Sequence, residues 1–487
     1  MSTNLPAIDW LIIAAYLVAS MAIGAWFGRG KQTAESFLVG GRQIGWPLLL
    51  ASIVATETST VTFLSLPGQS YADGGNFTFL QLAFGYIVGR LLVVAWLLPM
   101  YFRGEYLTAY ELLEAKCGPT VRRVASAIFL VTRNVGDGLR LLLTGLLVAA
   151  ATGVDFATSV VLLAVCTAIY AAVGGVASVV VNDFVQLITY TAGAFIVLAS
   201  LLGDIPGGAE GAWDFAAETG RLKLFDFSLS LTSPTITLLA GVVGGAALSM
   251  ASHGADHMMV QRYLCARTQR SAALALGLSG LVVAGQFLLF LVIGVALAAL
   301  FQADPPDYAA GGGDDALIGY IVHALGPGLR GLVVASVLAA SMSTLSSSLN
   351  ASAGVAVADL GRLIGIKGEG PGAVRAARVA TLVAAAAQVA VALVARRMEA
   401  SDDVIGAVLA VLGFATGLIL GLYALASALP RVTTAAGVGG LAAGCLACSV
   451  AAFGVGMSWP WFSLVGSTTT FCVGWWLSFF AITKAAE

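Results

Sequence analysis

The chain has 487 residues, of which 59% are hydrophobic and 10% charged, with a mean hydropathy of +0.93. Because soluble proteins carry about 25% Asp, Glu, Lys and Arg, its 24 basic and 26 acidic side chains are too few to cover a water-facing surface. Disorder is excluded since it requires low hydrophobicity, and a formal net charge of −2 gives no indication of nucleic-acid binding. The composition predicts a protein that lies in a lipid bilayer.

Apolar segments long enough to cross a bilayer recur along the whole chain. A spanning helix needs about 20 largely apolar residues, whereas a barrel strand needs only about 10 with alternating polarity. The sequence therefore predicts an all-α polytopic membrane protein, with residues 1–487 forming a single transmembrane domain. Thirteen spans are expected, at residues 8–28, 44–66, 80–102, 122–150, 154–174, 182–203, 235–255, 274–300, 329–356, 375–395, 404–426, 434–455 and 460–482.

The distribution of Lys and Arg predicts the orientation, because positively charged residues concentrate in cytoplasmic loops. With the N-terminus outside, 16 of the 24 basic residues fall in inner segments, 5 in outer segments and 3 within spans. We therefore expect an outer N-terminus and a cytoplasmic C-terminus. The expected location is a plasma membrane of the bacterial type (an inner membrane), and the expected functional unit is a monomer.

Two kinds of activity have no support in the sequence. No GxxxxGK[ST] loop is present to hold a nucleotide phosphate, so the use of ATP is not expected. No nucleophile–base pair or metal cluster indicates an enzyme. His253, Asp256 and His257 lie close together, but without an HExxH core they favour a structural role over a zinc site.

Six ionisable residues lie well inside the predicted spans, where each is costly unless it is paired or hydrated. They are Glu57, Arg90, Arg133, Asp137, Arg140 and Asp183. Arg133, Asp137 and Arg140 share one helix face with a surplus positive charge, since their spacing is i, i+4 and i+7. This face is either an internal salt bridge between neighbouring helices or a place where an arginine binds an anionic group of a substrate.

Residues 51–68 read ASIVATETSTVTFLSLPG and place a block of Thr, Ser and Glu in the middle of the membrane. Such side chains compete for backbone hydrogen bonds and favour local unwinding. Unwound backbone is tolerated in a membrane only where it lines a cavity, and many secondary transporters bind ions at broken helices of this kind.

Residues 337–354, VLAASMSTLSSSLNASAG, form a second hydroxyl-rich segment. Helical spacing puts its small and hydroxyl residues on two adjoining faces, one with Ala340, Ser343 and Thr344 and the other with Ser343, Ser346 and Ser347. Neutral oxygens suit a monovalent cation, and Asp183 would add one negative charge to the second set if its helix packs here. Serine-rich helices also occur as close-packing faces, which is the alternative.

Five stretches, in order along the chain, are similar to the solute:sodium symporter family, which includes sodium/glucose, sodium/proline and sialic acid transporters. They are FLVGGRQIGWP at 37–47, FLSLPGQSYADG at 63–74, YAAVGGVASVVVNDFVQ at 170–186, DHMMVQRYLCA at 256–266 and AASMSTLSSSLNAS at 339–352. The last of these resembles the family's sodium helix. On this resemblance the chain is identified as a member of the family.

The resemblance implies a LeuT-like core of two inverted five-helix repeats, at residues 44–203 and 235–426, with alternating access around a site at mid-membrane. An extra N-terminal helix at 8–28 and two extra C-terminal helices at 434–482 would lie outside this core. Segments 44–66 and 235–255 would be the broken pair, the second broken at Gly244 and Gly245.

The same resemblance implies one or two bound sodium ions and a solute cavity. The first sodium site maps onto Ala55, Thr58, Ala340, Ser343 and Thr344, and the second onto Asp183, Ser343, Ser346 and Ser347. The cavity maps onto Glu57, Ser59, Thr62, Phe77, Gln81, Arg133, Asp137, Arg140, Gly244 and Gly245. Arg133 is the first candidate to bind a substrate carboxylate and Arg140 the second.

These expectations describe a secondary active transporter that couples inward sodium flow to uptake of a small polar solute, such as a sugar, an amino acid, sialic acid or another carboxylate. Relatives carry Asn, Asp or Thr where this chain has Glu57. If ionised, Glu57 could assist sodium or pair with Arg133; if protonated, it could bind substrate or carry coupled protons. A proton-coupled carrier therefore stays open, as does a membrane sensor that binds its solute without transporting it.

Overall fold

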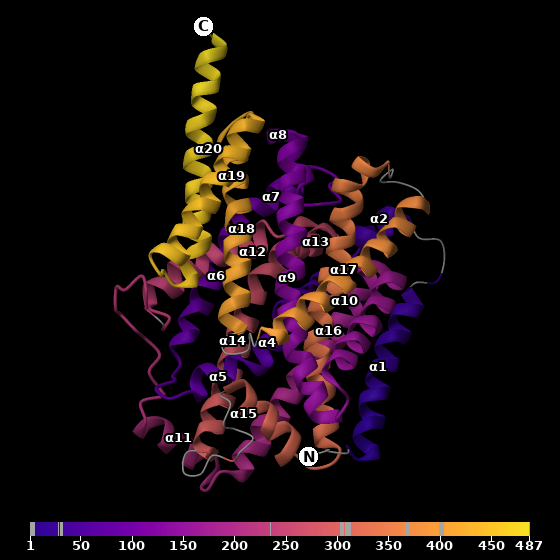
Figure 1. Ribbon diagram of the computed structural model, residues 1–487, viewed down its shortest axis with the longest axis vertical. Helices are drawn as coiled ribbons and strands as arrows, with labels where there is room; N and C mark the ends of the chain where they lie inside the picture. The colour runs from indigo at the N-terminus through magenta and orange to yellow at the C-terminus, as the bar shows by residue number, and fades with distance from the viewer. Residues whose placement is uncertain are drawn as a thin grey trace.

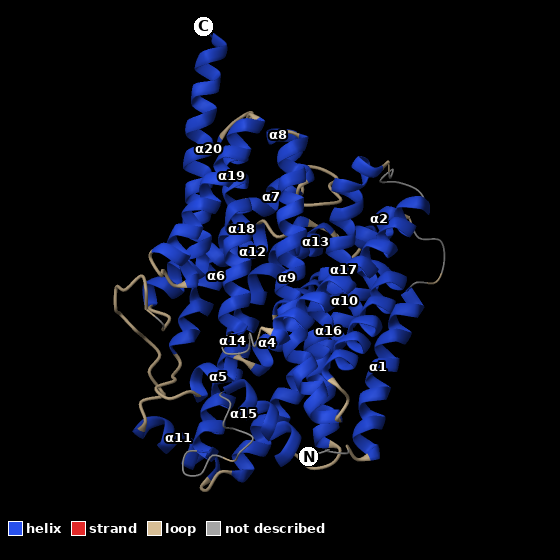
Figure 2. Ribbon diagram, viewed as in Figure 1, coloured by secondary structure: helices blue, strands red, loops and turns tan. Residues whose placement is uncertain are grey.

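The computed structural model describes residues 5–27, 29, 33–233, 235–301, 306, 313–365, 371–398 and 404–486. These residues form helices and loops, and they contain no strand, only an isolated bridge between Ile44 and Ala266 (Figure 2). The all-helical prediction is confirmed. α1 (Ala7–Phe27) begins at one end of the molecule and α20 (Phe462–Ala486) ends at the other (Figure 1), and we call these ends the N-terminal and C-terminal faces.

The helices differ widely in length, from 5 residues in α4 to 49 in α10. The other α-helices are α2 (Ala34–Val39), α3 (Trp46–Glu57), α4 (Thr60–Leu64), α5 (Leu66–Tyr71), α6 (Gln81–Ala95), α7 (Leu97–Tyr101), α8 (Glu111–Cys117), α9 (Pro119–Thr152), α10 (Phe156–Asp204), α11 (Gly208–Glu218), α12 (Gly245–Gly254), α13 (His257–Leu264), α14 (Gln269–Phe301), α15 (Gly313–Gly319), α16 (Leu329–Val355), α17 (Pro371–Arg397), α18 (Val404–Ala428) and α19 (Thr434–Ser449).

Nine helices in the described part of the chain are long and apolar enough to cross a membrane, or ten if the bent pair Trp46–Glu57 and Thr60–Tyr71 is one span. One reason that thirteen were expected is α10, which holds two predicted spans in 49 residues. It consists of two helices joined by a kink at Gly175, whose φ of 62° and ψ of −165° are non-helical and accessible to glycine. A Cβ at Gly175 would lie 2.8 Å from the carbonyl oxygen of Phe37, so the kink is also tightly packed.

The polar block in residues 51–68 breaks its helix, as the sequence predicts. α3 ends at Glu57, Thr58 and Ser59 are extended, and α4 begins at Thr60. The two helical parts are bent by 67°. The break leaves backbone groups and hydroxyls of this segment in the interior of the molecule, since Thr58 and Ser59 are buried.

The expected break at Gly244 and Gly245 is wrong. A π-helical turn at Ala240–Gly244 continues directly into α12, and both glycines have helical dihedral angles. Their role is close packing: a Cβ on Gly244 would lie 2.7 Å from the Pro460 carbonyl oxygen, and one on Gly245 would lie 3.0 Å from that of Leu82. The helix is interrupted further on, between α12 and α13 at Ala255 and Asp256.

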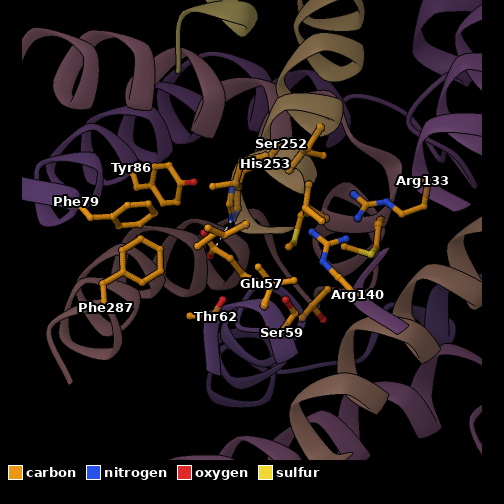
Figure 3. A pocket seen from close by; sticks show the side chains of 18 residues that line it. Glu57, Ser59, Thr62, Phe79, Tyr86, Arg133, Arg140, Ser252, His253 and Phe287 are labelled. Carbon is orange, nitrogen blue, oxygen red and sulfur yellow. Dashed lines mark hydrogen bonds and ion pairs between the residues drawn. The ribbon is translucent and has the colours of Figure 1, made fainter. Parts of the chain in front are cut away.

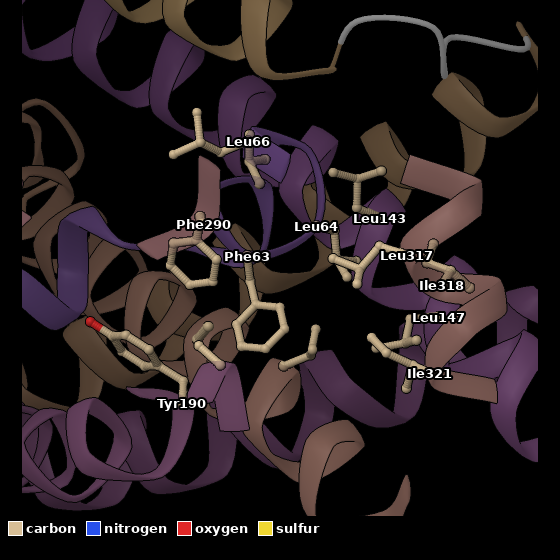
Figure 4. Close-up of a cluster of buried hydrophobic side chains, with 14 of the residues drawn as sticks. Phe63, Leu64, Leu66, Leu143, Leu147, Tyr190, Phe290, Leu317, Ile318 and Ile321 are labelled. Atoms are coloured by element: carbon tan, nitrogen blue, oxygen red, sulfur yellow. The ribbon is translucent and has the colours of Figure 1, made fainter. Parts of the chain in front are cut away.

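Apolar side chains fill the space between the helices and also cover the outside of the bundle. Figure 4 shows part of the larger interior cluster, in which the rings of Phe63 and Phe290 lie 5.2 Å apart beside Tyr190. Large apolar residues such as Leu11 and Phe453 are exposed at 68% and 89%. A surface of this kind is suited to lipid rather than water.

Candidate functional site

A cavity adjoins the break between α3 and α4 (Figure 3). It is surrounded by the broken segment, the short turn Thr78–Leu80 and helices α6, α9, α12, α13, α14 and α18. The lining residues are Thr56, Glu57, Ser59, Val61, Thr62, Phe79, Tyr86, Arg133, Arg140, Ser252, His253, Met258, Met259, Phe287, Ile405, Val408, Leu409 and Leu412.

Five of the predicted solute-binding residues line this cavity: Glu57, Ser59, Thr62, Arg133 and Arg140. The broken segment supplies the first three and α9 supplies the arginines. Figure 3 shows Arg140 and Ser59 on one side of the cavity and Tyr86, Phe79 and Phe287 on the other. The cavity therefore has a polar wall and an aromatic wall.

The other predicted solute-binding residues are not part of the lining. Phe77 lies in a loop, where its backbone N–H donates to the Lys223 carbonyl oxygen at 3.0 Å. Gln81 is buried and holds a loop in place, because its Nε2 donates to the Ile236 carbonyl oxygen at 2.7 Å. Asp137 lies behind the arginines, and Gly244 and Gly245 pack against neighbouring backbone as described above.

The sequence reading missed the aromatic wall. Phe287 contacts both Phe79 and Tyr86, with its ring centroid 5.7 Å from that of Phe79 and 5.9 Å from that of Tyr86. Aromatic residues in apolar helices usually face the core or the lipid, so composition gave no signal. Ser252 and His253 were also missed as lining residues, although His253 had been noted for its neighbours Asp256 and His257.

Glu57 pairs with Arg90 and not with Arg133. The Arg90 guanidinium donates to the Glu57 carboxylate and, at 3.1 Å, to Ser279. His253 Nε2 lies 3.4 Å from the same Glu57 oxygen. Because Arg90 is fully buried and Glu57 reaches the cavity, the pair presents a neutralised carboxylate to the solute space.

The surplus positive charge expected on α9 is balanced by a residue from another element. Asp137 accepts from Arg140 and lies 3.7 Å from Arg133 Nη1, as the helical spacing predicts. Asp256, which precedes α13, accepts from Arg133. Two arginines and two aspartates thus form a buried cluster of zero formal charge on the polar wall.

The hydroxyl and carbonyl groups of the first predicted sodium site lie together. Ser343 Oγ donates to the Ala55 carbonyl oxygen at 2.7 Å and to the Ala340 carbonyl oxygen at 2.9 Å. Thr344 Oγ1 donates to the carbonyl oxygen of Thr56 at 2.9 Å. Thr58, two residues after Thr56, is the exception, because its side chain donates to Gln286 at 2.6 Å. The donor set is buried and neutral, which fits a monovalent cation.

The residues predicted to bind a second sodium ion also lie near one another, but Arg262 lies among them. Asp183 accepts from Ser52 at 2.5 Å, and Ser347 Oγ lies 3.0 Å from Thr56 Oγ1. Arg262 contacts Ser347, and its Nη2 is 3.7 Å from Asp183. Ser346 turns away and donates to the Ser343 carbonyl oxygen at 3.2 Å. Arg262 was not foreseen because it lies outside the predicted spans.

Known proteins resemble this chain over most of its length. A family model described as "Sodium:solute symporter family" matches residues 37–444. Sodium-coupled monocarboxylate transporter 2 of Danio rerio is 29% identical over 452 residues, which cover 90% of this chain and 70% of the relative. Sodium/sialic acid symporter SiaT of Proteus mirabilis (strain HI4320) is 25% identical over 479 residues, which cover 96% and 94%.

Solved structures agree on the fold. A substrate-bound, outward-open Na⁺-coupled sialic acid symporter has a TM-score of 0.87 at 24% identity, with 96% of this chain and 97% of that chain covered. Mhp1, a nucleobase-cation-symport-1 family transporter, has a TM-score of 0.60 at 13% identity, with 90% and 92% covered. The first of these has the fold that the LeuT-like prediction describes.

This chain therefore belongs to the sodium:solute symporter family. It is an integral membrane transporter for a small solute, with sodium as its coupling ion, and it is not an enzyme. Members of this family couple transport to sodium, which favours sodium over protons as the coupling ion of this chain.

Proposed function

We propose that this symporter takes up a small organic anion with a carboxylate as the recognised group. The observation that carries the proposal is the pair of arginines on the polar wall of the cavity. Names of relatives support it, since monocarboxylates and sialic acid both carry a carboxylate. The Glu57 carboxylate is already neutralised by Arg90 and therefore offers little to an amine.

Arg140 is the better candidate for the first contact with the carboxylate. Its guanidinium pairs with one carboxylate, that of Asp137, and the Nε atoms of both Arg140 and Arg133 have no hydrogen-bond partner among the described residues. Arg133 is held by both Asp256 and Asp137. An arginine with unused donors binds a carboxylate more readily than one whose donors are engaged.

The rest of the cavity fits a solute with an apolar or aromatic body and a few hydroxyls. Ser59 and Thr62 supply hydroxyl groups from the broken segment. Phe79, Tyr86 and Phe287 supply apolar surface on the other side. A solute whose carboxylate binds Arg140 and whose apolar part packs against these rings would contact both walls.

Thr56 connects the solute cavity to both predicted cation sites. It lines the cavity, its carbonyl oxygen accepts from Thr344, and its hydroxyl lies 3.0 Å from Ser347. Sodium bound between Ala55 and Ser343 would fix this part of the broken segment and so order the solute site. This is a coupling free energy between two sites.

We propose that one sodium ion accompanies each solute. The first set, Ala55, Thr58, Ala340, Ser343 and Thr344, holds it. At the second set, Arg262 supplies a positive charge between Asp183 and Ser347, which leaves a second sodium without a role there.

The proposed orientation follows the distribution of basic residues. The C-terminal face is cytoplasmic, the N-terminal face is outside, and the membrane is a bacterial-type plasma membrane. Uptake then runs from the N-terminal to the C-terminal face, and the functional unit is a monomer that uses neither ATP nor nucleic acid.

Uptake into proteoliposomes tests the proposal. Lactate, nicotinate and N-acetylneuraminate are compared with glucose and proline under an inward sodium gradient, and then with choline in place of sodium at fixed pH. We expect uptake of a carboxylate that requires sodium and is lost in Arg140→Gln. Uptake of uncharged solutes alone would refute the proposal, and binding without counterflow of labelled solute would indicate a sensor.

A further inference from the structure

A second cavity adjoins the solute cavity on the side of the C-terminal face. It is much smaller than the solute cavity and shares four lining residues with it: Arg133, Arg140, Val408 and Leu412. Further along α18, Ala415 and Thr416 line the second cavity only. The two cavities therefore follow one another along α18.

The ion pair between Arg133 and Asp256 stands where these cavities meet. Arg133 lines both, whereas Asp256 lines only the second. Both side chains are almost completely buried, with 5% and 1% of the residue exposed. The pair thus closes the solute cavity toward the C-terminal face.

Asp256 links the junction between α12 and α13 to Arg133 on α9. One of its carboxylate oxygens accepts from the backbone N–H of Met258 at 2.8 Å and caps α13, and the other accepts from Arg133. Ala255, just before it, is also non-helical, and these two residues separate α12 from α13. A junction of this kind can move if its ion pair is released.

An anionic solute can break the ion pair between Arg133 and Asp256 directly. A solute carboxylate that reaches Arg133 competes with Asp256 for the same guanidinium. If Asp256 loses that partner and stays in place, it becomes a buried carboxylate without its counter-charge, which is strongly unfavourable. Movement of the α12–α13 junction toward water relieves that cost.

We infer that Arg133 exchanges partners during transport: it holds Asp256 when the cavity contains no solute, and it takes the solute carboxylate as the C-terminal side opens. Asp256 is then a positioning residue that makes opening depend on an anion. This inference rests on the proposed anionic solute.

Cysteine accessibility tests the exchange. Leu409→Cys, in a protein without its native cysteines, places a thiol in the solute cavity and not in the second one, so the ion pair lies between it and the C-terminal face. A membrane-impermeant maleimide is added from the C-terminal face of proteoliposomes. We expect slow labelling that lactate or N-acetylneuraminate, whichever is transported, accelerates by at least about fivefold with sodium, and Asp256→Asn should give the fast rate without any solute.

Two further variants separate closure from misfolding. Asp214→Asn, an exposed aspartate on α11, is the matched control and should label slowly. Arg133→Asp with Asp256→Arg rebuilds the pair in reverse, so it should restore slow labelling but abolish the acceleration by solute. Failure of this double variant to restore slow labelling, while Asp256→Asn labels fast, would show that the ion pair is not the closure.

Two other results would also overturn the inference. One is an Asp256→Asn protein that labels at the wild-type rate. The other is a wild-type protein that takes up the carboxylate but whose labelling the carboxylate does not change. Failure of the proposed function is distinct from both, because it is seen as absence of carboxylate uptake.

Discussion

Replacement of Ser343 by alanine tests the sodium site directly. Its hydroxyl is buried between the carbonyl oxygens of Ala55 and Ala340, at 2.7 and 2.9 Å. Ser343→Ala removes one of the proposed sodium ligands but leaves the carbonyl groups in place. Removing one hydrogen-bonding group from a charged partner costs about 1.5–3 kcal/mol, and each 1.4 kcal/mol is a factor of about ten in affinity.

We therefore expect the sodium concentration for half-maximal uptake to rise by about 10- to 100-fold. The measurement is initial solute uptake into proteoliposomes, with choline replacing sodium to keep ionic strength constant. Ser341→Ala is the control, because Ser341 is a buried serine on the same helix whose Oγ lies 2.8 Å from Thr144 and outside the cation set. An equal sodium dependence in both variants would refute the assignment of Ser343 as a ligand.

The remaining predictions concern packing, pairing and stoichiometry. Gly85→Ala should lower the melting temperature by a few degrees in detergent, because its Cβ would lie 2.2 Å from the Gly241 carbonyl oxygen; Gly277→Ala, in open space, should not. Arg90→Gln should lower the free energy of unfolding by about 3–5 kcal/mol, since it leaves Glu57 without its partner. The double variant with Glu57→Gln should recover most of that stability, and chemical denaturation measures both. Sodium activation of the wild type should be hyperbolic and become sigmoidal in Arg262→Gln; a sigmoidal wild-type curve would contradict the proposed single ion.

Local patterns in the sequence predicted what lies within one helix. The polar block of residues 51–68 was expected to unwind, and the chain does leave helical geometry at Thr58 and Ser59. The spacing of Asp137 and Arg140 predicted their contact. These features depend on residues a few positions apart, whose relative placement a helix fixes.

Partners from distant segments could not be predicted in this way. Arg133 and Asp256 are 123 residues apart, and Arg90 and Glu57 come from different helices. Gly244 and Gly245 looked like a break because glycine weakens a helix, whereas their actual role depends on the backbone of other segments. The structural role of a charged residue or a glycine within a membrane depends on the segments that pack against it.

The buried pairs also bear on the order in which the chain assembles in the membrane. Glu57 with Arg90 and Asp137 with Arg140 find each other within the first half of the chain, whereas Arg133 and Asp183 must wait for Asp256 and Arg262. Until residues 256–262 have been synthesised, two charges in the nascent bundle stay unmatched and must remain hydrated. The short segment from Asp256 to Arg262 is therefore the point in biosynthesis at which Arg133 and Asp183 obtain their remaining partners, and chains that stop before it should be substrates for membrane proteases.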